Sequence, residues 1–158
     1  MKYIELTKGF RAMVDDDDYE ELSQYKWSYS PSGDGSPNAI RNTGGNKNIS
    51  MHRQIMGNPV GIEIDHINRD PLDNRRSNLR LATRSQNAAN RGLQSNSTSG
   101  YKGVSWDSSR GKWYAHITVN RRMINLGRYV EIRDAIIAYN NAATLSFGEF
   151  ALLNDIGV

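Results

Sequence analysis

An acid and a histidine stand side by side at the end of a short β-branched stretch. They are Asp65 and His66; Asn78 follows 12 positions after the histidine, and Asn87 follows 22 positions after the acid. A neutral imidazole can accept a proton near neutral pH, and a carboxylate is a hard oxygen ligand suited to Mg²⁺. Phosphodiester cleavage needs a base, a metal, in-line geometry and cations that neutralise phosphate. We therefore interpret this stretch as a one-metal phosphodiesterase site.

The same segment is rich in arginine, which pairs well with phosphate. Other interpretations stay open, because His66 could be a hydrogen-bonded structural histidine, Asn78 a turn residue and Asn87 a surface helix residue. Neighbouring residues on a regular strand face opposite ways, so Asp65 and His66 converge only at a strand end or bend. The candidate phosphate-binding residues are Arg69, Arg75, Arg76, Arg80 and Arg84.

The elements around these residues follow the order strand, loop, strand, helix. Thr83 and Gln86 have the spacing of a capping box, which predicts that a helix starts there. Asn87 then lies about one turn into this helix, and its amide oxygen is a second metal ligand if the helix packs across the two strands. The predicted strands are 62–66 and 79–82, the turn-rich loop is 68–78, and the helix runs to Asn90 or Arg91 with Gly92 as its C-cap.

The flanking segments predict an α+β protein made of small modules. Residues 1–50 are predicted to form a small antiparallel sheet with one helix, which begins at the acidic run Asp15 to Asp18 and has Trp27 in the core. Residues 51–93 hold the candidate site, and 94–99 form a linker. Residues 100–155 are predicted to form three strands (101–106, 112–119 and 123–129) backed by a helix over 133–145, with 150–153 closing the core.

Composition limits the classes of function. The chain has 158 residues, 37% hydrophobic, with a net charge of +3 and no cysteine. Disulfides and thiolate zinc sites are thereby excluded, and no apolar run is long enough for a membrane span. Residues 1–50 carry 6 basic and 8 acidic side chains, whereas residues 51–96 carry 7 and 4. We expect a cytoplasmic protein, without a small-molecule cofactor, whose basic region binds a polyanion.

Residues 52–91 resemble the HNH nuclease family, in the form found in phage and intron-encoded homing endonucleases. The resemblance implies a ββα-metal fold in which Asp65 and Asn87 bind one Mg²⁺ or Mn²⁺ ion, His66 is the general base and Asn78 orients the loop. It also implies products with a 5′-phosphate and a 3′-hydroxyl. The matching residues are His52-Arg53, Ile64 to Asn68, Asp73 to Arg75, Ser77 to Arg80, Thr83 and Gln86-Asn87.

Residues 99–154 resemble an AP2 DNA-binding domain, through Tyr101 to Val104, Gly111 to Trp113, Leu126-Gly127, Ala138 to Asn140 and Asn154. In that family the sheet lies in the major groove. Alternation predicts an inner face that includes Trp113 and Ile124. The predicted DNA-binding residues on the outer face and turns are Lys102, Ser105, Arg110, Tyr114, His116, Thr118, Arg121, Arg122 and Asn125.

Together these features predict a site-specific homing endonuclease that acts on double-stranded DNA as a monomer or weak dimer. The N-terminal 50 residues resemble, more weakly, the leader of such nucleases, with Arg41 and Lys47 as further DNA contacts. The first alternative is a non-catalytic DNA-binding regulator of the AP2 type. The second is a purely structural polar domain.

Overall fold

The structure is a computed structural model that describes residues 1–31, 35–45, 47–93 and 96–157. The chain divides into two compact units, Met1–Ala82 and Thr83–Val158. The predicted nuclease segment 51–93 contributes to both units, and part of the predicted linker (94–95) lies outside the described residues. None of the helices in the described ranges is long and apolar enough to cross a membrane.

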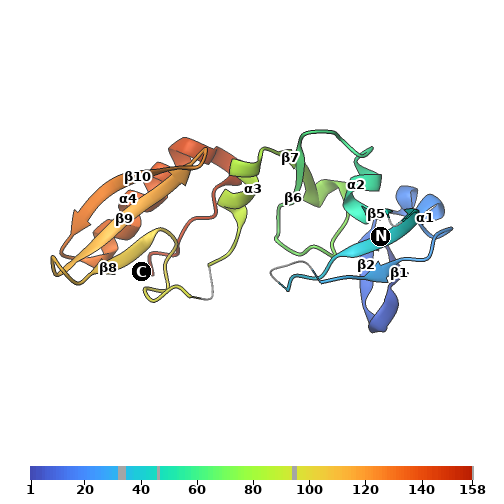
Figure 1. The fold of residues 1–158 in the computed structure, drawn as a ribbon, viewed down its shortest axis with the longest axis horizontal. Coiled ribbons are helices and arrows are strands. Elements are labelled where there is room, and N and C mark those ends of the chain that lie inside the picture. Colours follow the sequence, from blue (N-terminus) through green and yellow to red (C-terminus); the bar gives the residue numbers. More distant parts are fainter. Residues whose placement is uncertain (32–34, 46, 94–95, 158) are drawn as a thin grey trace. The chain divides into compact units, whose positions relative to one another are not determined.

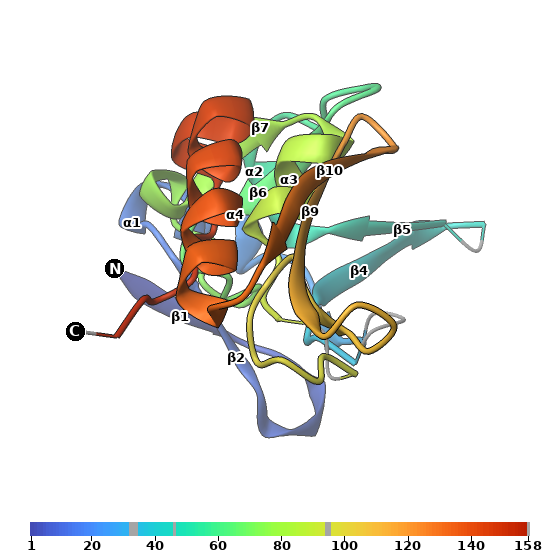
Figure 2. The same cartoon turned by 90° about the vertical axis from the view of Figure 1, so that its left-hand side faces the viewer.

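The first unit begins with an antiparallel hairpin. β1 (Lys2–Glu5) pairs with β2 (Arg11–Val14), and a short 3-10 turn, η1 (Thr7–Gly9), joins them. β3 (Ser28–Tyr29), β4 (Ala39–Gly44) and β5 (Lys47–Ser50) form a separate antiparallel sheet. Residues 1–50 therefore contain two small sheets rather than the single sheet predicted. The β4–β5 ribbon extends away from the rest of this unit (Figure 2).

Apolar side chains from both sheets and from α2 (Met51–Ile55) share one core. Trp27 is 1% exposed and its indole N–H donates to the carbonyl oxygen of Leu22 (2.8 Å), so its predicted core position is confirmed. Burying an aromatic ring of this size is a large contribution to stability. Tyr25 is 40% exposed and lies outside the short strand β3.

The acidic run starts a helix, α1 (Asp16–Leu22), as predicted. Asp15 stands at its N-cap but makes no side-chain capping bond. Its carboxylate instead accepts the backbone N–H of Arg76 (2.8 Å), and Asp18 binds the same arginine's guanidinium through Nε (2.9 Å) and Nη2 (2.6 Å). The acidic end of α1 therefore holds the loop that precedes β7 (Leu79–Ala82).

The second unit is built on a three-stranded antiparallel sheet in the order β10-β9-β8. The strands are β8 (Val104–Asp107), β9 (Lys112–Val119) and β10 (Arg122–Tyr129), and α4 (Ile132–Phe147) packs along one face (Figures 1 and 2). Ala115, Ile117 and the alanines of α4 form its core, as small residues on a packed helix permit. The three strands and the helix predicted here are therefore present.

Two details of this unit differ from the sequence-based prediction. The first strand begins at Val104 rather than residue 101, because residues 101–103 form a turn. Gly103 has a φ of +70°, and a Cβ there would lie 2.1 Å from the Tyr139 ring, so only glycine fits. Ile124, predicted to face inward, is 45% exposed; a bulge between Asn125 and Gly127 follows it and bends the strand.

Candidate nuclease site

The centre of the first unit's site is the antiparallel hairpin of β6 (Glu63–His66) and β7. Its register places Asp65 opposite Arg80 and His66 opposite Leu79. Arg80 Nε and Nη2 lie 2.9 Å and 2.8 Å from Oδ2 of Asp65, and both side chains are largely buried. Arg80, predicted as a phosphate-binding residue, is thus engaged by the predicted metal ligand within this hairpin.

His66 is the last residue of β6, at the strand end where the sequence predicted that it could converge with Asp65. Its Nε2 lies 3.3 Å from Oδ1 of Asn74, and its ring meets the His52 ring edge-on, with centroids 5.2 Å apart. Burial is the main cause that lowers the pKa of His66 below its ordinary value; Asn74 and the Asp65 carboxylate oppose that shift. The ring is therefore neutral at pH 7, which is the form that accepts a proton.

The neighbour of that imidazole is His52, a partly buried residue of α2. Burial, then the charges of His66 and Arg53, lower the pKa of His52 to about 3. Its Nδ1 is buried without a hydrogen-bond partner. His52 is thus a neutral ring that packs against His66 within the first unit.

Asn78 holds the loop that follows β6. Its Oδ1 accepts the backbone N–H of Asn68 (2.9 Å), and its Nδ2 donates to Asn68 Oδ1 (2.9 Å) and to the carbonyl oxygen of Asp73 (2.8 Å). Ile67 N–H also donates to the carbonyl oxygen of residue 78 (2.9 Å). These bonds close residues 67–78 into a rigid turn, because every amide atom of the Asn78 side chain has a partner.

Two further arginines of the segment are also paired with carboxylates. Arg75 binds Asp73 through Nε (2.8 Å) and Nη2 (2.6 Å), a two-bond pair, and Arg76 binds Asp18. The side chains of Arg75 and Arg76 remain 36% and 55% exposed, so both can still meet solvent. Arg69 is exposed, with a φ of +65° in the loop. Arg84 is exposed on α3 (Arg84–Asn90).

Asn87 lies in the helix that the capping box predicted. Thr83 accepts the backbone N–H of Gln86 (3.2 Å), and the Gln86 side chain accepts the backbone N–H of Thr83 (2.8 Å). The predicted helix start is therefore confirmed. The predicted glycine C-cap is wrong: Arg91 is the C-cap, with extended backbone dihedrals, and Gly92 is not among the glycines with positive φ.

This helix is held by the second unit, to which it belongs. Ala89 is 6% exposed in that unit's core, and its carbonyl oxygen accepts the backbone N–H of Leu152 (3.3 Å). Lys102 Nζ donates to the carbonyl oxygens of Ala89 and Arg91, where a cation complements a helix C-terminus. Lys102 is thus a helix-capping residue in this structure, and its predicted contact with DNA stays a prediction.

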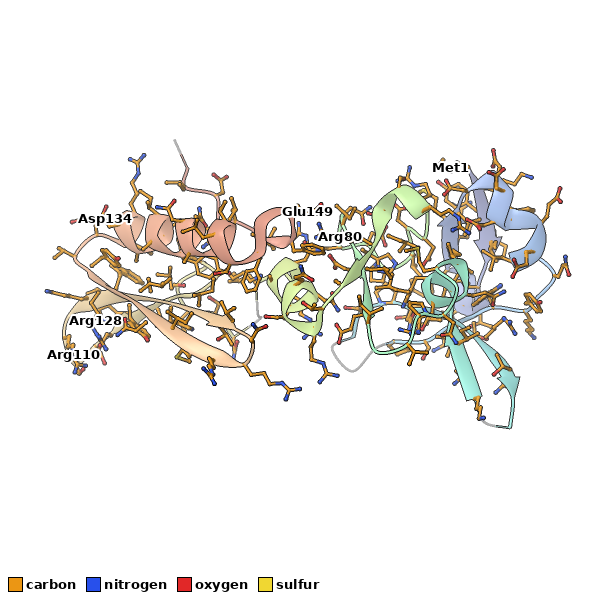
Figure 3. The ribbon with its side chains drawn as sticks, turned by 90° about the horizontal axis from the view of Figure 1, so that it is seen from above. Met1, Arg80, Arg110, Arg128, Asp134 and Glu149 are labelled. Carbon is orange, nitrogen blue, oxygen red and sulfur yellow. The ribbon has the colours of Figure 1, made fainter. Side chains whose placement is uncertain are left out.

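The open face of the β8–β10 sheet carries the remaining predicted DNA-binding residues. Tyr114 and His116 stack, with ring centroids 5.3 Å apart, and the Arg128 guanidinium lies over Tyr114. Asp107 orients Arg128 (2.8 Å) and Arg110 (3.2 Å), which lie close together in Figure 3. Ser105 is half-buried and pairs with Tyr114 in the sheet register. The exposed residues among the predicted set are Thr118, Arg121, Arg122 and Asn125.

Sequence reasoning missed three residues that the structure places against the predicted site residues. Asn74 touches His66, Asp73 binds Arg75 and Asn68, and Arg128 belongs to the open sheet face. Asp73 and Asn74 are among the residues that match the HNH family, but sequence reasoning assigned neither a role, because the density of Asn and Asp in the loop equally describes a turn. Arg128 was hidden because it follows the bulge, where simple alternation fails.

The donors predicted for a metal are one carboxylate and one amide oxygen, a set suited to a hard divalent cation. In the part of the chain that the structure describes, no three His, Asp or Glu side chains cluster as a metal site. Both bonds from Arg80 go to one oxygen of Asp65, Oδ2, and a carboxylate has about four lone-pair sites. Asp65 therefore fits a metal with few protein ligands rather than a closed structural site.

Comparison with known proteins gives the family. A family model described as HNH endonuclease matches residues 54–89, which include the end of α2, the β6–β7 hairpin and most of α3. Protein 3.8 of Escherichia phage T7 is 39% identical over 67 residues, which are 42% of this chain and 55% of the phage protein. The chain thus spans about half the length of that relative. No solved structure matches the chain.

A second relative covers nearly the whole chain. The uncharacterized HNH endonuclease L560 of Acanthamoeba polyphaga mimivirus is 33% identical over 155 residues, which are 94% of this chain and 77% of the viral protein. The match extends beyond the short motif into both compact units. The chain therefore belongs to the HNH endonuclease family.

Proposed function

We propose that this protein is a metal-dependent DNA endonuclease of the HNH type, and specifically a site-specific homing enzyme. The observation that supports this most directly is the end of β6, where the half-buried, neutral His66 adjoins the Asp65 carboxylate. A neutral imidazole beside a carboxylate supplies the base and the metal ligand that phosphodiester hydrolysis needs. Family membership adds that this combination occurs within an HNH endonuclease match.

In the proposed reaction His66 accepts the proton of the attacking water. Asn78 keeps the loop after His66 closed, so that the imidazole is held at one position relative to the hairpin. Asp65 and Asn87 would hold one Mg²⁺ or Mn²⁺ ion, which would stabilise charge on the phosphate and the leaving oxygen. Arg69 and Arg84 are the exposed cations proposed to neutralise neighbouring phosphates.

The second unit is proposed to bind double-stranded DNA through its open sheet face, in the manner of an AP2 domain. Tyr114, His116 and Arg128 supply aromatic and cationic groups, and Asp107 fixes the arginine in place. The exposed Arg121 and Arg122 at the β9–β10 turn are placed to contact phosphates. Arg41, which lies over the Tyr25 ring, and Lys47 are proposed as weaker contacts from the first unit.

The test is cleavage of supercoiled plasmid carrying candidate target sites, with Mg²⁺ and with a chelator. We expect metal-dependent nicking by the wild-type protein, and its loss in His66→Ala and in Asn87→Ala. Ser108→Ala, an exposed change in a turn, is the matched control and should cut like the wild type. Nicking that survives His66→Ala would refute the mechanism.

The same experiment separates an enzyme from a regulator. Gel-shift titration on the candidate sites should give binding that weakens steeply as salt rises, because phosphate contacts release counterions. Tight binding with no cleavage in any metal would identify a DNA-binding regulator of the AP2 type instead. Binding that hardly changes with salt would contradict the proposed arginine contacts.

A further inference from the structure

Asn74 is a buried polar residue within hydrogen-bond distance of the proposed base. It is 0% exposed, and both its backbone and its side-chain amide make hydrogen bonds. Its backbone N–H donates to the carbonyl oxygen of Met13 (2.8 Å), which ties the loop to β2. Its Nδ2 lies 3.4 Å from the carbonyl oxygen of Pro71, and its Oδ1 lies 3.3 Å from His66 Nε2.

The carbonyl of Pro71 decides which way the Asn74 amide points. A carbonyl oxygen only accepts hydrogen bonds, so the amide nitrogen must face Pro71 and the amide oxygen must face His66. An amide oxygen also only accepts. A neutral imidazole has one protonated and one unprotonated nitrogen. Because the Asn74 oxygen can only accept, the ring nitrogen that faces it, Nε2, must be the protonated one.

We propose that Asn74 is a positioning residue that holds His66 in the tautomer protonated on Nε2, so that Nδ1 is the nitrogen that accepts the proton of water. The assignment of Nδ1 as the base rests on the proposed nuclease function, whereas the tautomer itself does not. Orientation by a hydrogen bond at the far ring nitrogen is a general way of fixing which imidazole nitrogen reacts.

The surroundings restrict the ring in the same orientation. The His52 ring packs edge-on against His66 at an interplanar angle of 87°, which opposes a flip that would exchange the two nitrogens. Asn78 Nδ2 donates to the carbonyl oxygen of Asp73, the residue before Asn74. The loop that carries Asn74 Oδ1 therefore makes hydrogen bonds to β2, to the Asn78 side chain and between its own residues.

The direct test is nitrogen-15 NMR of the full-length protein with a chelator present, at pH 8. The chain has three histidines, and the signals of His66 are those absent from His66→Ala. We expect wild-type His66 to show a protonated Nε2 and an unprotonated Nδ1. A proton on Nδ1, or an even mixture of tautomers, would overturn the proposal without any measurement of activity.

Variants of Asn74 supply the causal test. In Asn74→Leu, which has similar volume and no acceptor, we expect both tautomers to be populated and plasmid nicking to lose about 10-fold to 100-fold in kcat at unchanged KM. Asn74→Asp keeps an acceptor and should keep the Nε2-protonated tautomer. Asn141→Leu makes the same change at an exposed asparagine of α4 and serves as the control for both readouts.

Three outcomes are decisive. An unchanged tautomer in Asn74→Leu, with folding verified by Trp27 emission, would refute the role of Asn74. If that variant does not fold, loss of the Nε2-protonated form in Asn74→Asp would refute it instead. The wild-type tautomer without any nicking would support the positioning of His66 while rejecting the proposed nuclease function.

Discussion

His52 should make the first unit sensitive to mild acid. Burial lowers its pKa from 6.5 to about 3 in the folded state, whereas the unfolded chain titrates near 6.5. Because the folded pKa is depressed, the unfolded state binds more protons as pH falls below 6.5. The stability contributed by the neutral ring is therefore fully present above pH 6.5 and is lost progressively toward pH 3.

The size of the loss follows from the two pKa values. Each pKa unit corresponds to about 1.4 kcal/mol. Between pH 7 and pH 5, His52 should lower the free energy of unfolding of the first unit by about 2 kcal/mol, and by pH 4 by about 3 kcal/mol. His66 acts in the same direction, because burial also lowers its pKa.

Urea titrations at pH 7, 6 and 5, with a chelator present, measure this loss. Trp27 is the only tryptophan of residues 1–82 and is 1% exposed, so its emission reports the unfolding of this unit. Trp106→Phe and Trp113→Phe remove the signals of the second unit. In this background His52→Phe keeps a ring and removes the titration, so it should lose about 2 kcal/mol less than the parent between pH 7 and pH 5.

His116→Phe is the matched control, because it makes the same change in the second unit. It should leave the pH dependence of Trp27 emission unchanged. If the free energy of unfolding fell equally with pH in His52→Phe and in its parent, the argument would be refuted. That result would mean that His52 is solvated or protonated in the folded protein. A parent protein equally stable at pH 7 and pH 5 would refute it as well.

Three other predictions concern α3 and the hairpin. Arg80→Met removes the guanidinium that pairs with the buried Asp65 carboxylate and should destabilise the first unit by about 3 kcal/mol or more, measured by the same titration; a loss under 1 kcal/mol would contradict the ion pair. Thr83→Ala removes the capping box and should cost α3 about 1 kcal/mol, seen as faster amide exchange. Lys102→Met should also speed that exchange, by up to about tenfold, whereas Lys112→Met, an equal loss of charge on β9, should not.

The sequence predicted most accurately those features that depend on neighbours in the chain. The capping box at Thr83 and the β9 strand appear at the predicted residues, because a cap and an alternating strand are local patterns. The hairpin that carries Asp65 and His66 was predictable for the same reason. A short apolar and β-branched run on each side of a turn-rich loop fixes its two strands.

Other features depend on residues that meet only in the folded chain. Lys102 could be assigned to a DNA-binding surface from its type alone, but its partners are helix carbonyls more than ten residues earlier. Asn74 belongs to a loop whose composition specifies turns, not which side chain points at His66. Asp15 and Asp18 pair with Arg76 about sixty residues away in the sequence. Composition does not predict which residues meet across such a separation.

The border between the two units falls within the nuclease motif, after Ala82, and this limits how the chain can be recombined. A chimaera that exchanged the C-terminal sheet at residue 93 would keep α3 but discard Lys102, Leu152 and the core around Ala89, leaving a seven-residue helix without its partners. Isolated helices of that length are unstable in water. The workable junction lies between Ala82 and Thr83, so a new C-terminal unit must bring its own α3.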